Sequence, residues 1–401
     1  MARRGSFRVL FLLLSSGALG AALSVTSCGP SFMDGLIGGR RDAAPSPDGE
    51  VEAGICTPTV LPERPDPTNP ANVVDVLFAL EALRLDTEGV LDAGVAAPRG
   101  LDLDGVCTCP AASSCLTPDA GVEPCDGPEG RDNALARFFN QLGRRFVGFP
   151  EDFATADILE GRSNVLLGLQ GWNGEADDNS VVVTLLNSQW LDKPAHDGGR
   201  RENPRFDGTD VWSVDPESIA EGERLLDAGA DCRDGICIEL IADENAYVRD
   251  GELVARPKKR STDATPIAIR TGLGRLVIEL NEAVIKARIT SDGSRHRLTG
   301  EIVGRWPLDK MLRAIANMES IPLPGLPTSH ICQDLTTYRL VKDIVCAAAD
   351  LSVTKAQDGV GAPCGAISAA ISFSASPAVA GHVIRREAPT PCSDWSDTCG
   401  D

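Results

Sequence analysis

The chain contains few histidine and aromatic residues. Phe, Trp and Tyr make up 4% of its 401 residues, and there are four His and two Tyr. Histidine is the most frequent general acid or base in enzymes, so its scarcity leaves few groups for acid–base catalysis. The sequence also lacks a P-loop, an H-E-x-x-H zinc motif, a G-x-S-x-G elbow and an EF-hand register. These absences favour a protein that is not an enzyme.

Basic residues are scarce relative to acidic ones. The chain has 38 Lys and Arg against 58 Asp and Glu, a formal net charge of -20. So negative a protein repels phosphate backbones, and the composition therefore predicts no nucleic-acid partner. The hydrophobic content of 42% is ordinary for a globular protein and is enough for one large core or two smaller ones.

The N-terminus has the pattern of an export signal. Arg3, Arg4 and Arg8 precede an apolar segment at residues 9–25 that Ser and Gly interrupt. This segment is shorter than the roughly 20 strongly apolar residues of a membrane-spanning helix. We therefore expect residues 1–27 to be a signal peptide.

The signal ends in Val25-Thr26-Ser27-Cys28, which resembles the lipobox of bacterial lipoproteins. The resemblance covers residues 1–28 only. It implies cleavage before Cys28, acylation of Cys28 and attachment to a membrane through two or three acyl chains, which together give lasting anchorage. Gly29 in place of Asp implies the outer membrane or cell surface. An ordinary cleaved signal with Cys28 as a thiol is the alternative.

The remaining cysteines predict a disulfide-bonded protein. An exported chain with an even number of cysteines outside the cytoplasm is expected to oxidise them. With Cys28 assigned to lipid, the 13 cysteines leave twelve for six disulfides, namely Cys56, Cys107, Cys109, Cys115, Cys125, Cys232, Cys237, Cys332, Cys346, Cys364, Cys392 and Cys399.

Short sequence separations suggest which cysteines pair. We expect Cys232 with Cys237, Cys392 with Cys399, and two bridges within residues 107–125. The alternative for this last group is a zinc site, but its spacing lacks the paired C-x-x-C pattern. Its four ligands would be Cys107, Cys109, Cys115 and Cys125.

The composition divides the chain into three parts. After the signal, residues 28–71 hold the acylated Cys28 and a Pro-, Gly- and Asp-rich stretch without hydrophobic periodicity, which predicts a flexible tether. Residues 72–401 carry the apolar patterns and are expected to form a disulfide-rich, mainly β globular domain.

The stretch 164–188 indicates the fold of this domain. Residues 165–169 and 181–186 are short, branched and apolar on both faces, and Gly171, Asn173, Gly174 and Asn179 supply turn residues between them. Strands of this kind are buried between two layers. We therefore predict a mainly β fold, an antiparallel β-sandwich with a few packed helices and several disulfides.

Other stretches carry weaker patterns. Residues 273–305 predict three antiparallel strands with turns at 281–282 and 291–293. Helices are expected after Asn133, from Pro307 and over about 336–349, and a strand over 366–375. Shorter strands are expected at 209–214, 236–241 and 246–248. Residues 73–85 fit a helix or a strand, with a slight preference for a strand.

Two acidic loops are candidate sites. The first contains Asp102, Asp104, Asp126 and Asp132 beside Gly and Cys residues, and Ca²⁺ binds carboxylate and carbonyl oxygens held by such rigid loops. We keep calcium there as a hypothesis. Solvated turns are the alternative.

The second loop combines an aromatic ring with amide and carboxylate groups, the usual materials for binding a sugar. Its residues are Trp172, Asn173, Glu175, Asp177 and Asp178. The same carboxylates would serve a glycosidase if two of them faced each other across a cleft.

Together these patterns predict a lipid-anchored envelope or cell-surface protein that acts as a non-catalytic binding or structural module. Its ligand would be a protein or a carbohydrate. The alternative is an exported hydrolase that uses the carboxylates of the second acidic loop.

Overall fold

The structure is a computed structural model, and the residues it describes belong to one compact unit, Ile55–Asp401. The signal peptide, Cys28, most of the predicted tether and the pair Cys232 and Cys237 lie outside the described residues. The described ranges are 59–67, 73–85, 99–107, 115–116, 126–143, 151–192, 203–215, 241–259, 262–271, 274–293, 295–319, 329–359, 361–383, 392 and 394–399.

The described residues form ten strands and four α-helices, so the fold is mainly β, as predicted. The strands are β1 (Val74–Arg84), β2 (Asn164–Trp172), β3 (Asp178–Ser188), β4 (Val211–Val214), β5 (Ile241–Arg249), β6 (Glu252–Ala255), β7 (Ala264–Thr271), β8 (Gly274–Asp292), β9 (Arg295–Pro307) and β10 (Ala366–Val383). The helices are α1 (Ala134–Gly143), α2 (Glu151–Leu159), α3 (Leu308–Ala316) and α4 (Leu335–Ala347).

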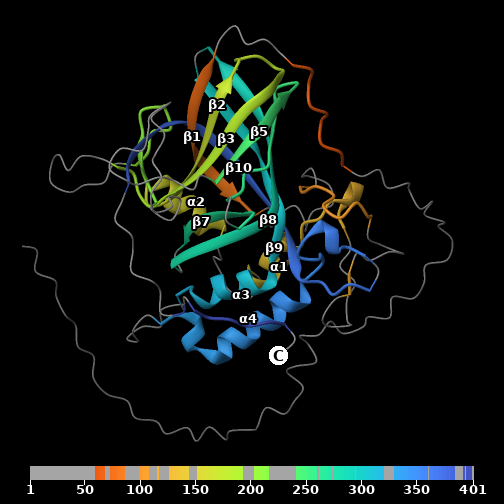
Figure 1. Cartoon of the computed structure of the whole chain (residues 1–401). Helices are drawn as coiled ribbons and strands as arrows, with labels where there is room; N and C mark the ends of the chain where they lie inside the picture. Colours follow the sequence, from red (N-terminus) through yellow and green to blue (C-terminus); the bar gives the residue numbers. More distant parts are fainter. Residues whose placement is uncertain are drawn as a thin grey trace, which may run out of the picture. The chain divides into compact units, whose positions relative to one another are not determined.

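Eight of the strands close into an antiparallel barrel (Figure 1). The order is β1-β2-β3-β5-β6-β8-β9-β10, and β10 pairs back with β1, for example at Leu77 and Ala378. Outside this ring, β4 pairs parallel with β10, and β7 pairs with β8. The predicted sandwich is therefore wrong. A sandwich and a barrel require the same strand patterns, and only the pairing of the first strand with the last distinguishes them.

The inside of the barrel is packed with apolar side chains. Phe78, Leu167, Val183, Ile285 and Ile371 belong to one buried cluster, and each is at most 2% exposed. An eight-stranded barrel is just wide enough for side chains to fill it. This interior is therefore a hydrophobic core.

Parts of the outer wall are also covered. On one side Leu166 and Leu186 pack against Trp212 of β4, and on another Val303 packs with Leu101, which lies outside the ring. These contacts explain why β2 and β3 are apolar on both faces. The two buried strands predicted there are confirmed, although their layers belong to a barrel.

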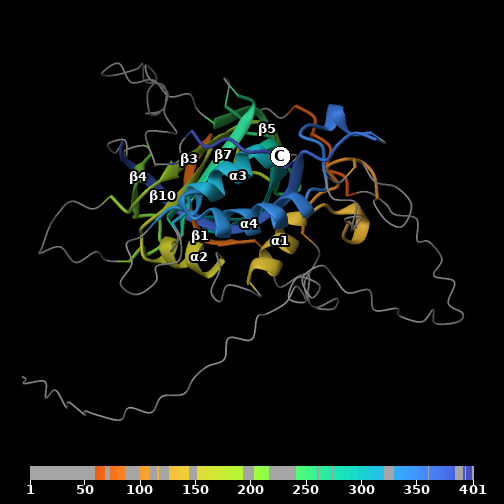
Figure 2. The same cartoon turned by 90° about the horizontal axis from the view of Figure 1, so that it is seen from below.

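The helices lie toward one end of the barrel (Figure 2). α3 contacts β8, β9 and α4, α2 contacts β1 and β7, and α1 contacts β10. The predicted helices are confirmed, and their starts follow the expected chemistry. The side chain of Asn133 accepts a hydrogen bond from Ala136 N at 3.3 Å, and that of Asp334 caps α4.

One predicted turn is instead a bulge within a long strand. β8 continues through Asn281 and Glu282 as far as Asp292, with an irregular register opposite β9 and a φ of 50° at Glu282. A bulge and a tight turn both use a residue in the left-handed region, so the sequence did not distinguish them. The turn at 291–293 is confirmed, and β1 is a strand.

The disulfides join distant parts of the chain. Bridges for which both cysteines are described are Cys115–Cys364, Cys332–Cys392 and Cys346–Cys399. The predicted pair Cys392–Cys399 is therefore wrong, because α4 and the short helix before it bring other cysteines to this tail. The prediction of two bridges within 107–125 also fails, since Cys115 leaves the group.

The zinc alternative is wrong as well, because Cys107 and Cys115 are both disulfide-bonded.

Bridges of this kind form in oxidising compartments, so the protein is exported. Among the described residues, no helix has the length and apolar character needed to cross a membrane.

A short segment of the predicted tether lies against the barrel. Arg64 donates to the carbonyl oxygens of Asn179, at 2.5 Å, and Asn245, and Tyr247 Oη donates to Pro62 O at 2.5 Å. The packed part of the chain therefore includes residues 59–67, ahead of the boundary at residue 72 that the composition indicated.

Candidate functional site

The first acidic loop brings three of its four candidate ligands together. Asp102, Asp104 and Asp132 place one carboxylate oxygen each within 4.8 Å of one another. Asp126 is outside this group of three, although its charge acts on Asp102 and Asp132. We call Asp102, Asp104 and Asp132 the acidic cluster.

Two chain segments meet closely at the acidic cluster. Asp132 N donates to Leu101 O at 3.1 Å, and Leu103 N donates to Asp132 Oδ2 at 2.7 Å. Gly100 has a φ of 113°, and a Cβ there would lie 2.4 Å from Asp132 O. Glycine is therefore required at this position, both for its backbone conformation and for the close approach.

The turn that follows holds the first two carboxylates. Gly105 N donates to Asp102 Oδ1 at 2.6 Å, and Val106 N donates to Asp104 Oδ1 at 2.8 Å. The other oxygen of each side chain, Oδ2, is buried and has no hydrogen-bond partner within the described part of the chain. Asp104 is 8% exposed. Buried polar atoms are usually hydrogen-bonded, and these two oxygens are exceptions that a bound ligand would explain.

Burial and mutual repulsion make it unfavourable for all three carboxyl groups of the acidic cluster to be ionised at once. Burial raises the pKa of Asp132 to about 10, and the charges of Asp350, Asp104 and Asp126 add to this effect. Burial, with contributions from Asp104 and Asp126, raises the pKa of Asp102 to about 6. Asp132 therefore keeps its proton at neutral pH unless a cation replaces it.

A buried arginine fixes the neighbouring backbone. Arg305 of β9 is 1% exposed, and its guanidinium donates to both oxygens of Asp358 at 2.9 and 2.6 Å. It also donates to Leu103 O and Ser352 O, each at 2.9 Å, and its Nε lies 3.1 Å from Glu282 Oε2. Arg305 was not among the site residues predicted from the sequence. Its signal is a charged side chain inside the apolar run 302–306.

The segments around Arg305 and the acidic cluster form one layer, which we call the outer cover. It consists of residues 99–107, 126–134 and 350–359. Ala134 N donates to Ser368 Oγ of β10 at 2.7 Å, and Asp350 accepts from Ser368 N and Oγ, so the cover is hydrogen-bonded to the barrel wall.

The second acidic loop is the hairpin between β2 and β3, and its polar groups bond to one another. Asn173 N donates to Asp178 Oδ2 at 2.7 Å, and Glu175 N donates to Asn173 Oδ1 at 2.8 Å. Asp177 Oδ1 accepts from Asp250 N at 2.9 Å. Glu175 is exposed and Asp178 is 4% exposed. The carboxylates therefore shape the hairpin.

Trp172 is buried. Its side chain is 3% exposed, its Nε1 donates to Glu175 O at 3.0 Å, and its ring packs edge-to-face against His296 at 5.1 Å between centroids. A sugar ring stacks on an open aromatic face, which Trp172 does not offer. The hairpin thus lacks the stacking surface that the sequence suggested.

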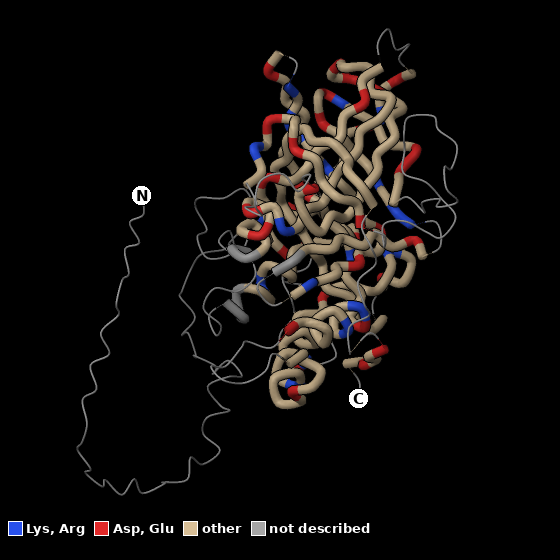
Figure 3. Tube along the Cα trace, turned by 90° about the vertical axis from the view of Figure 1, so that its left-hand side faces the viewer, with Lys and Arg blue, Asp and Glu red and all other residues tan. Residues whose placement is uncertain are grey.

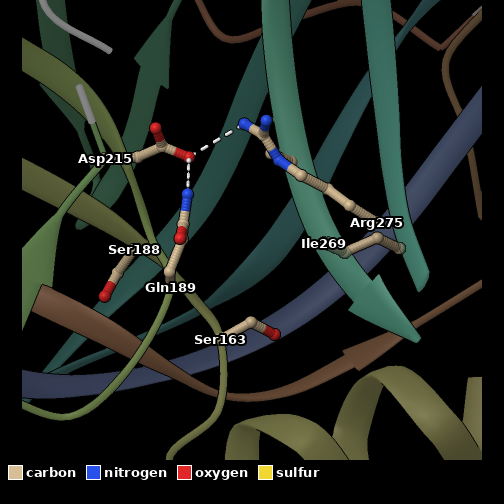
Figure 4. Close-up of a pocket in the computed structure, with 7 residues that line it drawn as sticks. Ser163, Ser188, Gln189, Asp215, Ile269 and Arg275 are labelled. Atoms are coloured by element: carbon tan, nitrogen blue, oxygen red, sulfur yellow. Dashed lines mark hydrogen bonds and ion pairs between the residues drawn. The ribbon is translucent and has the colours of Figure 1, made fainter. Parts of the chain in front are cut away.

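A small cavity lined by both polar and apolar side chains lies elsewhere, and none of the candidate residues lines it (Figure 4). Asp215 Oδ2 accepts from Arg275 at 2.8 Å and from Gln189 Nε2 at 3.3 Å. The cavity has a volume of about 20 Å³, enough for one water molecule. Gln189 Oε1 is buried and, among the described residues, without a hydrogen-bond partner.

Acidic residues are most frequent at turns and loops on the face that Figure 3 shows.

Comparisons of the chain with protein-family models, curated proteins and solved structures find no match. The fold and its cysteines therefore define the class of the protein. It is an exported, disulfide-bonded, closed antiparallel barrel with helices toward one end.

Proposed function

We propose that this protein is a lipid-anchored envelope or cell-surface module with a binding or structural role and no catalytic activity. The observation that carries this proposal is the barrel interior, where the described strands pack apolar side chains against one another. A barrel filled in this way offers a rigid outer surface for a partner and no lumen for a small substrate.

The anchor rests on the Val25-Thr26-Ser27-Cys28 motif and on export. The three disulfides support transfer of the chain out of the cytoplasm, where lipoproteins of this kind are acylated. Residues 29–58 separate Cys28 from the first described residue. A stretch of this length holds a barrel clear of the lipid surface. Gly29 favours the outer membrane or the cell surface.

The non-catalytic role draws support from the second acidic loop. A glycosidase needs two carboxyl groups that face each other across a substrate. Asp178 instead accepts hydrogen bonds from Asn173 N and Ser180 N inside the hairpin, and Asp177 holds the neighbouring turn. No specific contact favours the hydrolase over a module that binds a protein or carbohydrate on its surface.

The anchor is tested by Cys28→Ser. The thioether to the lipid needs the Cys28 thiol, so the variant is expected in the soluble envelope fraction, whereas the wild type sediments with membranes and incorporates labelled palmitate. Ser31→Ala, a short distance downstream, is the matched control and stays with the membranes. A Cys28→Ser protein that still sediments after a high-salt wash contradicts the proposal.

A further inference from the structure

We propose that the acidic cluster, Asp102, Asp104 and Asp132, binds one divalent cation and that this cation is Ca²⁺. One carboxylate oxygen from each residue lies within 4.8 Å of the others. Two oxygens on opposite sides of Ca²⁺ are about 4.6 to 5.2 Å apart, twice the usual Ca–O distance of about 2.3 to 2.6 Å. Three oxygens at most 4.8 Å apart lie within about 2.8 Å of a common point, so a small inward shift brings all three side chains onto a single ion.

A second observation points to a ligand independently of this grouping. Asp104 is 8% exposed, and its Oδ2 has no hydrogen-bond partner among the described residues, as is also true of Asp102 Oδ2. The remaining oxygens of these two side chains already accept from backbone amides of the turn. The turn thus fixes both carboxylates and leaves one buried oxygen of each free to bind a cation.

Neighbouring basic side chains have other partners. Arg131 donates to Gly100 O at 3.0 Å and pairs with Glu129 at 2.7 Å. Arg305 pairs with Asp358. Lys355 lies beside Gly105 on the exposed side of the turn, and within the described ranges no ion pair joins it to the acidic cluster. A small cation supplies the positive charge that these side chains do not.

The ligand set favours Ca²⁺ over other divalent cations. All three ligands are carboxylate oxygens, which suit hard ions, and the nearby Cys107 is disulfide-bonded and provides no thiolate for zinc. Asp102 and Asp104 are two positions apart on one turn and Asp132 comes from another segment, and together they supply three of the roughly six to eight ligands that Ca²⁺ takes. Ca²⁺ accepts irregular shells completed by water and carbonyl oxygens, whereas Mg²⁺ requires near-ideal octahedral geometry.

The bound ion would fasten two segments of the outer cover to each other. It joins the turn at 102–106 to Asp132, which lies two residues before α1, and the first residue of α1, Ala134, donates through its N–H to Ser368 Oγ of β10. The turn is also held to β9 through Leu103 O and Arg305. The cation would therefore complete a connection between two segments that lie far apart in sequence. This inference does not depend on the lipid anchor.

The test begins with equilibrium dialysis of the full mature chain, solubilised in mild detergent and stripped of metal with EDTA. At fixed ionic strength we expect saturable binding of one Ca²⁺ per chain below about 1 mM and little competition from equimolar Mg²⁺. The melting temperature should rise in Ca²⁺ and not in Mg²⁺, because only the folded form assembles the site. Absence of bound Ca²⁺ overturns the proposal, and equal binding of Mg²⁺ overturns its choice of ion.

Asp104→Asn keeps the size of the side chain and removes one charge, so we expect the affinity for Ca²⁺ to fall by about tenfold or more. Without metal, the same variant should melt at or above the wild-type temperature, because it relieves repulsion within the acidic cluster. Asp250→Asn is the matched control, since its side chain is 82% exposed and lies in another turn. Its affinity should remain at the wild-type value.

Asp102→Asn provides a second variant at a more exposed position, which keeps the test decisive if Asp104→Asn does not fold. It should weaken Ca²⁺ binding in the same way. Unchanged affinity in a folded Asp104→Asn or Asp102→Asn protein would assign any bound calcium to a different place and overturn the inference.

Discussion

The barrel interior and the outer cover are held in different ways. The interior is a cluster of apolar side chains on paired strands. The cover has little regular structure and buries ionisable groups instead, including Asp132 at 1% exposure and Asp350 at 7%. Its Asp358 pairs with Arg305 of β9, which is 1% exposed. Paired strands satisfy their own backbone groups, whereas irregular segments need specific polar partners.

Because of this difference, the contacts of the outer cover fix its position more strictly than the contacts of the barrel interior fix its side chains. Hydrophobic burial has no direction, so many apolar side chains of similar size fill a barrel. The guanidinium of Arg305 has fixed donor directions, and it binds Leu103 O, Ser352 O and Asp358 from one position. Charged contacts therefore determine where the cover docks, while apolar contacts supply most of the stability of the barrel.

The largest expected effect comes from Arg305→Met. The substitution leaves Asp358, whose side chain is 10% exposed, buried without its partner and also removes the donors to two carbonyl oxygens. Breaking one side of a buried ion pair costs about 3 to 5 kcal/mol. We expect a loss of this size in the free energy of unfolding, measured by urea denaturation.

The matched control is Ile285→Val in the barrel interior, where removal of one methylene costs about 0.5 to 1.5 kcal/mol. The double variant Arg305→Met with Asp358→Leu should recover part of the loss, because it removes the uncompensated charge. If Arg305→Met costs no more than Ile285→Val, the distinction between the two regions is wrong.

A smaller effect is expected from removal of the Cys115–Cys364 bridge by substitution of both residues with Ser. The bridge fastens a segment that also pairs through backbone hydrogen bonds between Leu116 and residues 362–364. Its loss should lower stability by about 2 to 4 kcal/mol. Limited proteolysis should then cut near the outer cover before it cuts the barrel strands.

The corresponding double substitution of Cys346 and Cys399 is the comparison for this experiment. That bridge joins α4 to the C-terminal tail, so early cleavage should move to the tail. If the two variants were cleaved at the same sites, neither bridge would specifically protect the segment that it joins.

Local elements could be predicted from the sequence, and their long-range arrangement could not. The hairpin of β2 and β3, the α1 cap at Asn133 and the turn at 291–293 all depend on neighbouring residues. Closure of the barrel pairs Leu77 with Ala378, and nothing near either residue signals the other. The disulfide predictions failed for the same reason. Cys346 and Cys399 are distant in sequence, and the packing of α4 brings them together.

The candidate site was partly predictable. Flanking Gly and Cys residues predicted one site from Asp102, Asp104, Asp126 and Asp132. Three of these come together, and Asp132 does so through the close approach at Gly100, which the sequence did not indicate. The burial of Trp172 depends on His296, which comes from a strand more than a hundred residues away. Arg305 was missed, because its partner Asp358 comes from a segment that sequence alone does not place beside β9.

The smallest expected effect concerns a charged contact that is less deeply buried than those of the outer cover. Asp397 in the C-terminal tail accepts from Lys342 Nζ at 2.7 Å and from Tyr338 Oη at 2.8 Å, both on α4. Burial raises the pKa of Asp397, but the hydrogen bonds from Lys342, Tyr338 and Thr398 N outweigh it and leave the pKa below its usual value.

A lowered pKa in the folded state means that the unfolded chain binds a proton more readily. The stabilisation is therefore complete above the unfolded pKa of about 4 and is lost as the pH falls through the lower folded value. We expect Asp397→Asn to cost roughly 1 kcal/mol at neutral pH, measured by urea denaturation, and the difference from wild type to shrink below about pH 4. Asp343→Asn, exposed on the same helix, should show neither effect. A cost for Asp397→Asn that does not change with pH would mean that shape, rather than charge, fastens the tail to α4.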